Sequence, residues 1–179
     1  VPGVEILPYP QVFRVISETI FDLGGTAGGF GRQAERTVLY DTDSVGAAPA
    51  ICYESIYGDF MAEFVRNGAE HIFIITSDAW WGNTPGFKQH LQYASLRAIE
   101  LRRSIARSAN TGISAFINQR GDILQPTEYW EPAVIRETIH ANDDITFYAR
   151  HGDYLARTAA WLSPLVFLAA FVKRKTHKY

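Results

Sequence analysis

Residues 47–55 read AAPAICYES and contain Cys52, the only cysteine among the 179 residues. An apolar run leads into Cys52 and a polar, turn-like segment follows it. This pattern is typical of a strand that presents a side chain at its carboxyl end, where α/β folds usually keep their chemistry. A lone cysteine beside Ile51 is most often a small buried hydrophobe, but a thiolate is also a good nucleophile towards acyl carbon. These residues alone leave both interpretations open.

The composition fits one folded unit of moderate size. Hydrophobic residues make up 47% of the chain and aromatic residues 13%, which is enough for a substantial core. The 17 Lys and Arg are balanced by 19 Asp and Glu, so the net charge is -2. This balance gives no reason to expect a nucleic acid partner. A single cysteine excludes a disulfide within the chain.

Downstream of Cys52, the sequence predicts a helix and then a second strand. Apolar residues recur at helical spacing through 56–67, and Asn67-Gly68 is a good helix-ending signal. Residues 71–76 (HIFIIT) form a continuous apolar run typical of a buried strand. We expect this strand to lie parallel to the strand that ends at Cys52, because the order strand, helix, strand is a βαβ unit.

Two adjacent tryptophans, Trp80 and Trp81, follow the second strand closely. Aromatic side chains at the carboxyl end of a strand can line a pocket. Alternatively, one ring packs in the core and the other lies on the surface. The residues alone favour neither interpretation.

The best helical pattern covers residues 87–108, with apolar residues on one face. We expect most of its arginines to form a solvated face; they are Arg97, Arg102, Arg103 and Arg107. Residues 111–117 are predicted to be a strand, 118–121 a hairpin turn, and 133–139 a strand with one solvated face. The glycine-rich residues 24–31 lack the Gly-Lys-Ser/Thr ending of a phosphate-binding loop. They are predicted to be a surface loop that could act as a lid.

The C-terminal stretch is predicted to span a membrane. Residues 155–172 carry one charge, at Arg157, and a basic tail follows. A helix of about 18 residues extends about 27 Å, close to the roughly 30 Å of a bilayer's hydrocarbon core. Tyr154 and Trp161 would lie in the aromatic belt at one end, and the basic tail would stay in the cytoplasm. The alternative is a buried C-terminal helix.

Five segments taken together resemble the carbon-nitrogen hydrolase (nitrilase) superfamily. They are 51–54 (ICYE), 67–70 (NGAE), 77–80 (SDAW), 97–100 (RAIE) and 107–114 (RSANTGIS). The terminal span makes the likeness greatest to the membrane-bound branch that acylates lipoproteins. The resemblance implies an α/β fold: residues 1–150 are the C-terminal part of a nitrilase-like αββα sandwich. Residues 153–172 are then a transmembrane helix and 173–179 a basic cytoplasmic tail.

The resemblance also implies roles for individual residues. Cys52 corresponds to the nucleophile, and the backbone N–H of Tyr53 to part of the oxyanion hole. Glu54 and Glu5 correspond to glutamates that support the site. From the residues alone, Glu5 is either an exposed loop carboxylate or a partly buried acid with a raised pKa.

Other family features fall elsewhere. Trp80 and Trp81 lie on a loop that borders the acyl-chain cavity in the family, and His90 matches a family position without an assigned role. The catalytic lysine and the general-base glutamate of the family would both precede Val1. We therefore expect this chain to be the C-terminal part of a longer enzyme, inactive alone.

The implied reaction is acyl transfer through a Cys52 thioester. The donor is a membrane phospholipid, and the acceptor is the N-terminal amine of a diacylglyceryl-cysteine lipoprotein; no cofactor, metal or nucleic acid is expected. The implied location is the bacterial inner membrane, with the catalytic domain on the periplasmic side. Two alternatives remain: an amidase or nitrilase acting on a small substrate, and a non-catalytic, membrane-tethered binding module.

Overall fold

The computed structural model describes residues 35–41 and 44–176, and within these one sheet holds six strands. In spatial order they are β1 (Leu39–Tyr40), β2 (Gly46–Ile51), β3 (His71–Thr76), β4 (Ser104–Ala109), β5 (Ala115–Ile117) and β6 (Ile123–Leu124). The three longest strands, β2, β3 and β4, run parallel at the centre. The outer strands pair antiparallel.

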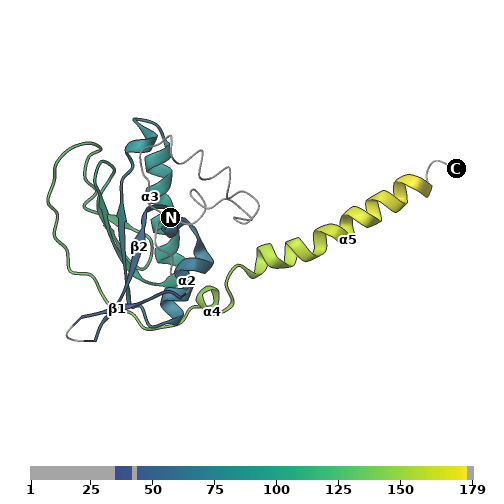
Figure 1. The fold of residues 1–179 in the computed structure, drawn as a ribbon, viewed down its shortest axis with the longest axis horizontal. Helices are drawn as coiled ribbons and strands as arrows, with labels where there is room; N and C mark the ends of the chain where they lie inside the picture. The colour runs from purple at the N-terminus through teal and green to yellow at the C-terminus, as the bar shows by residue number, and fades with distance from the viewer. Residues whose placement is uncertain (1–34, 42–43, 177–179) are drawn as a thin grey trace, which may run out of the picture.

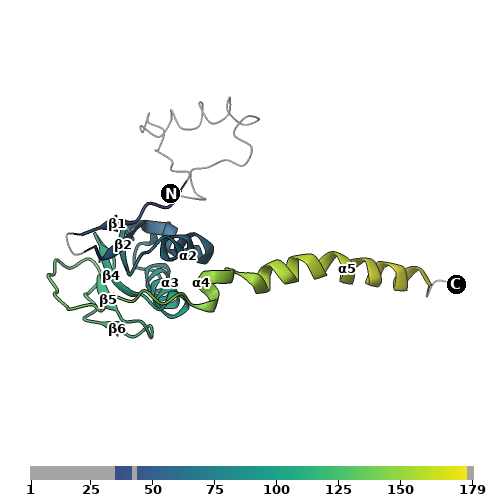
Figure 2. The ribbon, with the colours of Figure 1, turned by 90° about the horizontal axis from the view of Figure 1, so that it is seen from below.

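Helices cover one face of this sheet (Figure 2). They are α2 (Gly58–Arg66), α3 (Gly86–Leu101) and the short α4 (Phe147–His151), which packs beside α2 and α3. The core lies between them and the sheet. Alternate residues of β2 and β3, such as Ala50 and Ile72, meet Met61 and Val65 of α2 and Ala94 of α3 there.

The predicted βαβ unit is confirmed. Strand β2 is followed by a 3-10 helix, η1 (Cys52–Ile56), then by α2 and by β3, which lies parallel to β2 with Ile51 opposite Ile75. Helix α2 ends at the predicted signal, where Gly68 has a φ of 100° that a side chain would disfavour. A second 3-10 helix, η2 (Ala79–Trp81), follows β3.

The prediction that β3 is a buried strand is only half right. Ile72, Ile74 and Thr76 are buried, whereas Phe73 is 40% and Ile75 55% exposed. The reason is that the described helices lie on a single face of the sheet. The opposite face therefore presents apolar side chains from β2, β3 and β6 to solvent.

Two predicted elements differ in the structure. The helix expected over 87–108 ends at Leu101, because Arg102 takes a left-handed φ of 52° and the next residues form β4 against β3. The hairpin at Asn118 is present, with Gly121 at a φ of 88°. The strand expected over 133–139 is instead a loop: Val134 is 99% exposed, and the Arg136 carbonyl accepts its hydrogen bond from a side chain rather than from a neighbouring strand.

Helix α5 (Tyr154–Thr176) projects away from the sheet and its helices (Figure 1). Its window Tyr154–Phe171 has a mean hydropathy of 1.3, and none of it is buried against the described domain. Against the described residues, α5 is therefore not a buried helix. By length and composition, α5 is able to cross a membrane.

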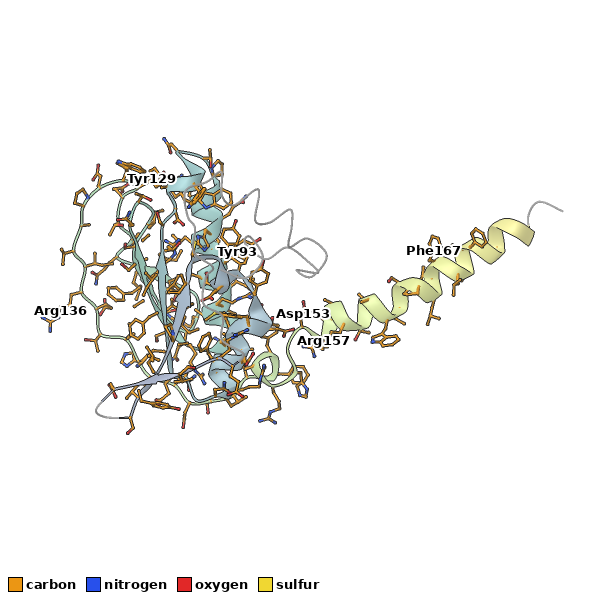
Figure 3. The ribbon with its side chains drawn as sticks, viewed as in Figure 1. Tyr93, Tyr129, Arg136, Asp153, Arg157 and Phe167 are labelled. Atoms are coloured by element: carbon orange, nitrogen blue, oxygen red, sulfur yellow. The ribbon has the colours of Figure 1, made fainter. Side chains whose placement is uncertain are left out.

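The junction between α4 and α5 is built around Asp59 of α2, and Figure 3 labels Asp153 and Arg157 where α5 begins. One Asp59 oxygen accepts the backbone N–H of Asp153 (2.9 Å), and the other binds the Arg157 guanidinium (2.9 Å). Gly152, at a φ of 65°, lets the chain pass close to both side chains. We call Asp59, Gly152, Asp153 and Arg157 the elbow, because they join the start of α5 to α2.

Candidate active site

Cys52 lies where β2 passes into η1, in an unfavourable backbone conformation. Its φ of 52° falls in the left-handed region, which residues other than glycine rarely adopt because Cβ crowds the carbonyl oxygen. The side chain is partly buried. Such conformations persist only where the surroundings hold them, and they cluster at functional sites.

Three polar contacts hold η1 in place. The Ser55 hydroxyl donates to the carbonyl oxygen of Cys52 (2.8 Å). The Glu54 carboxylate accepts the backbone N–H of Ile51 (2.7 Å). Arg97 of α3 donates to the last carbonyl of η1, that of Ile56 (3.1 Å). Hydrogen bonds therefore hold the turn that carries Cys52 at its start, in its middle and at its end.

The Tyr53 ring packs between two aromatic neighbours. Its centroid lies 5.3 Å from that of His90 and 6.0 Å from that of Trp81, with an interplanar angle of 29° in each case. Together with Gln89 and Tyr93, these rings line a cleft of about 30 Å³. Burial and the neighbouring Cys52 raise the pKa of the Tyr53 hydroxyl, so it stays protonated at neutral pH.

A buried ionic network lies directly behind η1. Asp78 follows β3 and is fully buried; one of its oxygens contacts Nδ1 of His90 (2.8 Å) and the other binds Arg107 of β4 (2.7 Å). Burial alone would raise the pKa of Asp78, but the hydrogen bonds from His90 and Arg107 outweigh burial and lower it. Nε2 of His90 then faces the Ser55 hydroxyl at 3.4 Å.

The structure separates the two tryptophans. Trp81 packs against Tyr53 and lines the cleft, with Gly86 directly beneath its ring. Trp80 is 91% exposed and points away from the core. Of the sequence-predicted residues, Cys52, Tyr53, Glu54 and Trp81 therefore lie together, Trp80 does not line the cleft, and Glu5 falls outside the described residues. The 24–31 loop is likewise outside them.

Sequence reasoning missed Ser55, Asp78 and Arg107, and it expected Arg107 to be solvated. The signal available for Arg107 was that it is the charged residue of β4, whose other residues are small or apolar. A charged side chain is rarely buried without a partner. Within residues 35–41 and 44–176, no group of three or more His, Cys, Asp or Glu could hold a metal ion.

The family model of carbon-nitrogen hydrolases matches residues 6–144. The chain belongs to the carbon-nitrogen hydrolase family. Its region of match contains η1, α3 and the Asp78 network, so the site described above lies within the family's own domain. The long helix α5 lies outside it.

Two of the curated relatives that this chain matches carry the same name. A protein of Chlorobaculum tepidum named apolipoprotein N-acyltransferase is 32% identical over 98% of this chain and 33% of its own length. A protein of the same name from Allorhizobium ampelinum is 41% identical over 69% of this chain and 23% of its own length. The chain thus spans about a third or less of the length of these relatives.

Among solved structures, an amidase from Nesterenkonia sp. is similar to this chain. It has a TM-score of 0.53 at 16% identity, over 76% of this chain and 51% of the amidase. This likeness bears on the fold and agrees with a nitrilase-like α/β arrangement.

Proposed function

We propose that this chain is part of an N-acyltransferase that matures bacterial lipoproteins. The acyl donor is a membrane phospholipid, and the acceptor is the N-terminal amine of a diacylglyceryl-cysteine lipoprotein. The observation that carries the proposal is the match to a relative named apolipoprotein N-acyltransferase over 98% of the chain, which reaches into the exposed apolar helix α5. An anchored enzyme is suited to two lipid-anchored substrates, because all three share one surface.

The proposed reaction proceeds in two acyl-transfer steps at Cys52. The thiolate attacks the ester carbonyl of the phospholipid, the ester C–O bond breaks, and the lysophospholipid leaves with a proton. The lipoprotein amine then attacks the thioester, loses its proton to a base, and releases the thiol. Each step passes through an oxyanion, for which we assign the backbone N–H of Tyr53 as one donor.

The proposal places further groups around Cys52. Glu54 supports the turn through its bond to Ile51, and Glu5 is assigned a supporting role. Trp81 and the exposed Trp80 border the space for the acyl chain. The base glutamate and the lysine of the family's catalytic set are assigned to sequence that precedes Val1, so we expect the 179-residue chain alone to be inactive.

In this proposal residues 153–172, which contain most of α5, are the transmembrane segment, and 173–179 form a cytoplasmic tail. The domain of residues 1–150 then faces the periplasm. A variant with Lys173→Cys in a Cys52→Ala background tests this orientation. A membrane-impermeant maleimide should label the new cysteine only after the inner membrane is opened. Labelling in intact spheroplasts would contradict the orientation.

Intact mass spectrometry of the full-length protein, beside its Cys52→Ala variant, tests the chemistry. With phospholipid supplied and the lipoprotein acceptor withheld, we expect an added fatty-acyl mass that hydroxylamine removes and that the variant lacks. If no adduct forms, the acyl-enzyme mechanism fails. Release of ammonia from a small amide under the same conditions would favour the amidase alternative, and neither product would favour a binding module.

A further inference from the structure

The carbonyl oxygen of Cys52 is held by a side chain with no part in the proposed chemistry. Ser55 is fully buried, three residues further along η1, and its hydroxyl donates to that oxygen at 2.8 Å. Because Cys52 has a φ of 52°, its peptide plane is turned away from the direction that β2 would give it. The Ser55 bond therefore fixes the orientation from which both the Cys52 side chain and the following peptide N–H project.

Ser55 is itself held by a line of buried groups. Its hydroxyl lies 3.4 Å from Nε2 of His90, and Nδ1 of the same ring lies 2.8 Å from Asp78. Arg107 binds the second oxygen of Asp78 at 2.7 Å and also donates to the Ile113 carbonyl. The side chains of His90, Asp78 and Arg107 are 2% exposed or less, so none of them is free to relax into water.

His90 contacts η1 a second time, through its ring. The ring stacks on that of Tyr53 at a centroid distance of 5.3 Å. The His90 ring, fixed by Asp78, thus contacts both Tyr53 and Ser55. Tyr53 follows Cys52, and Ser55 holds the Cys52 carbonyl. A group placed in this way acts on the geometry at Cys52 through Tyr53 and Ser55.

We propose that Ser55 is a positioning residue for Cys52, and that His90, Asp78 and Arg107 hold Ser55 in place. The inference rests on the proposed function only in taking Cys52 as the nucleophile. Small misplacements of a reacting group cost about a hundredfold in rate. We therefore expect loss of the Ser55 hydroxyl to slow acylation of Cys52 by about ten- to a hundredfold, with little change in the KM for the donor.

The chain offers a matched control in Ser95 of α3. Its hydroxyl also donates to a backbone carbonyl, that of Gly121 (2.6 Å), and Ser95 is 9% exposed against 0% for Ser55. Ser55→Ala and Ser95→Ala each remove one serine-to-carbonyl bond, so a purely structural effect is common to both. Ser55→Thr keeps the hydroxyl but adds a buried methyl group, so its rate should lie between those of Ser55→Ala and the wild type.

The experiment uses the full-length protein in detergent with two acyl donors. The first is a phospholipid in mixed micelles with the detergent, and thioester formation is followed by mass spectrometry. The second is p-nitrophenyl butyrate, an activated ester that reports acylation of Cys52 as a burst of p-nitrophenolate and needs no lipid. Ser55→Ala should slow both reactions relative to Ser95→Ala at equal thermal stability of the two variants.

The outcomes separate this proposal from the proposed function. If the wild type gives no thioester with phospholipid but a burst with the activated ester, lipid acylation fails, and the burst rates decide the role of Ser55. If Ser55→Ala and Ser95→Ala acylate at the same rate, the positioning role is overturned. A Ser55→Ala variant that changes only the KM for the donor would overturn it as well.

Discussion

A single methyl group at Gly112 should disrupt the buried network behind the cysteine. A Cβ built there lies 2.7 Å from Cγ of Asp78 and closer still to Oδ2, the atom that binds Arg107. Asp78 is fully buried and packed on all sides, so its carboxylate has to move away from Arg107 rather than into water. Separating the partners of a buried ion pair costs about 3–5 kcal/mol, and we expect Gly112→Ala to destabilise the protein by about that amount.

The matched control is Gly82→Ala, one residue after η2. Nothing lies within 4 Å of a Cβ at Gly82, but its φ of 54° disfavours a side chain. Because its ψ is -158°, this backbone lies in a region essentially restricted to glycine, and strain alone predicts a loss of about 1–3 kcal/mol there. Urea unfolding of the full-length protein in detergent, followed by tryptophan fluorescence, measures both. The reasoning is refuted if Gly112→Ala costs no more than Gly82→Ala.

Three further predictions concern charged groups. The folded pKa of Asp78 is lowered. Its contribution to stability is therefore present above its ordinary pKa of 3.8 and is lost as the pH falls through the lowered value. In urea unfolding from about pH 5 to 2, the unfolding free energy of the wild type should approach that of Asp78→Asn only below 3.8. Arg103 is 1% exposed and donates to three backbone carbonyls at 3.0 Å or less. Arg103→Met should therefore lower the unfolding free energy by about 3 kcal/mol. The control, Arg120→Met at an exposed position, should lower it by about 0.5 kcal/mol or less. For Asp59 and Arg157, whose side chains are about half exposed, a double-mutant cycle of the alanine variants should give a coupling of about 0.2–1 kcal/mol; a coupling of zero would show that the ion pair contributes nothing at the elbow.

The parts of the fold that local patterns control could be predicted from the sequence. The end of α2 at Asn67 depends on a glycine, the turn at Asn118 on another, and the strand before Cys52 on an apolar run followed by polar residues. Each of these signals acts within a few residues of the structure it specifies. For this reason the βαβ unit and the position of Cys52 at a strand end could be predicted from the sequence.

The errors came from residues whose surroundings are set by distant parts of the chain. Ile105 continues the apolar spacing of α3, yet pairing with β3 puts it in a strand. Arg97, Arg103 and Arg107 look like a solvated stripe, but their partners are backbone carbonyls and carboxylates that lie up to 41 residues away. The alternation through 133–139 has the period of a strand, but its backbone has no ladder partner among the described strands.

The elbow has a consequence for how substrates would be found. Only Gly152 and Asp153 separate the end of α4 from the start of α5, and Asp59 holds Asp153 and, in α5, Arg157. The domain is therefore joined to α5 by a short connection and not by a long flexible linker. With α5 in a bilayer, Cys52 would stay at a nearly constant height above the lipid, and encounters would become a two-dimensional search. Lateral diffusion, rather than the reach of a flexible arm, would then set how often a donor or an acceptor arrives.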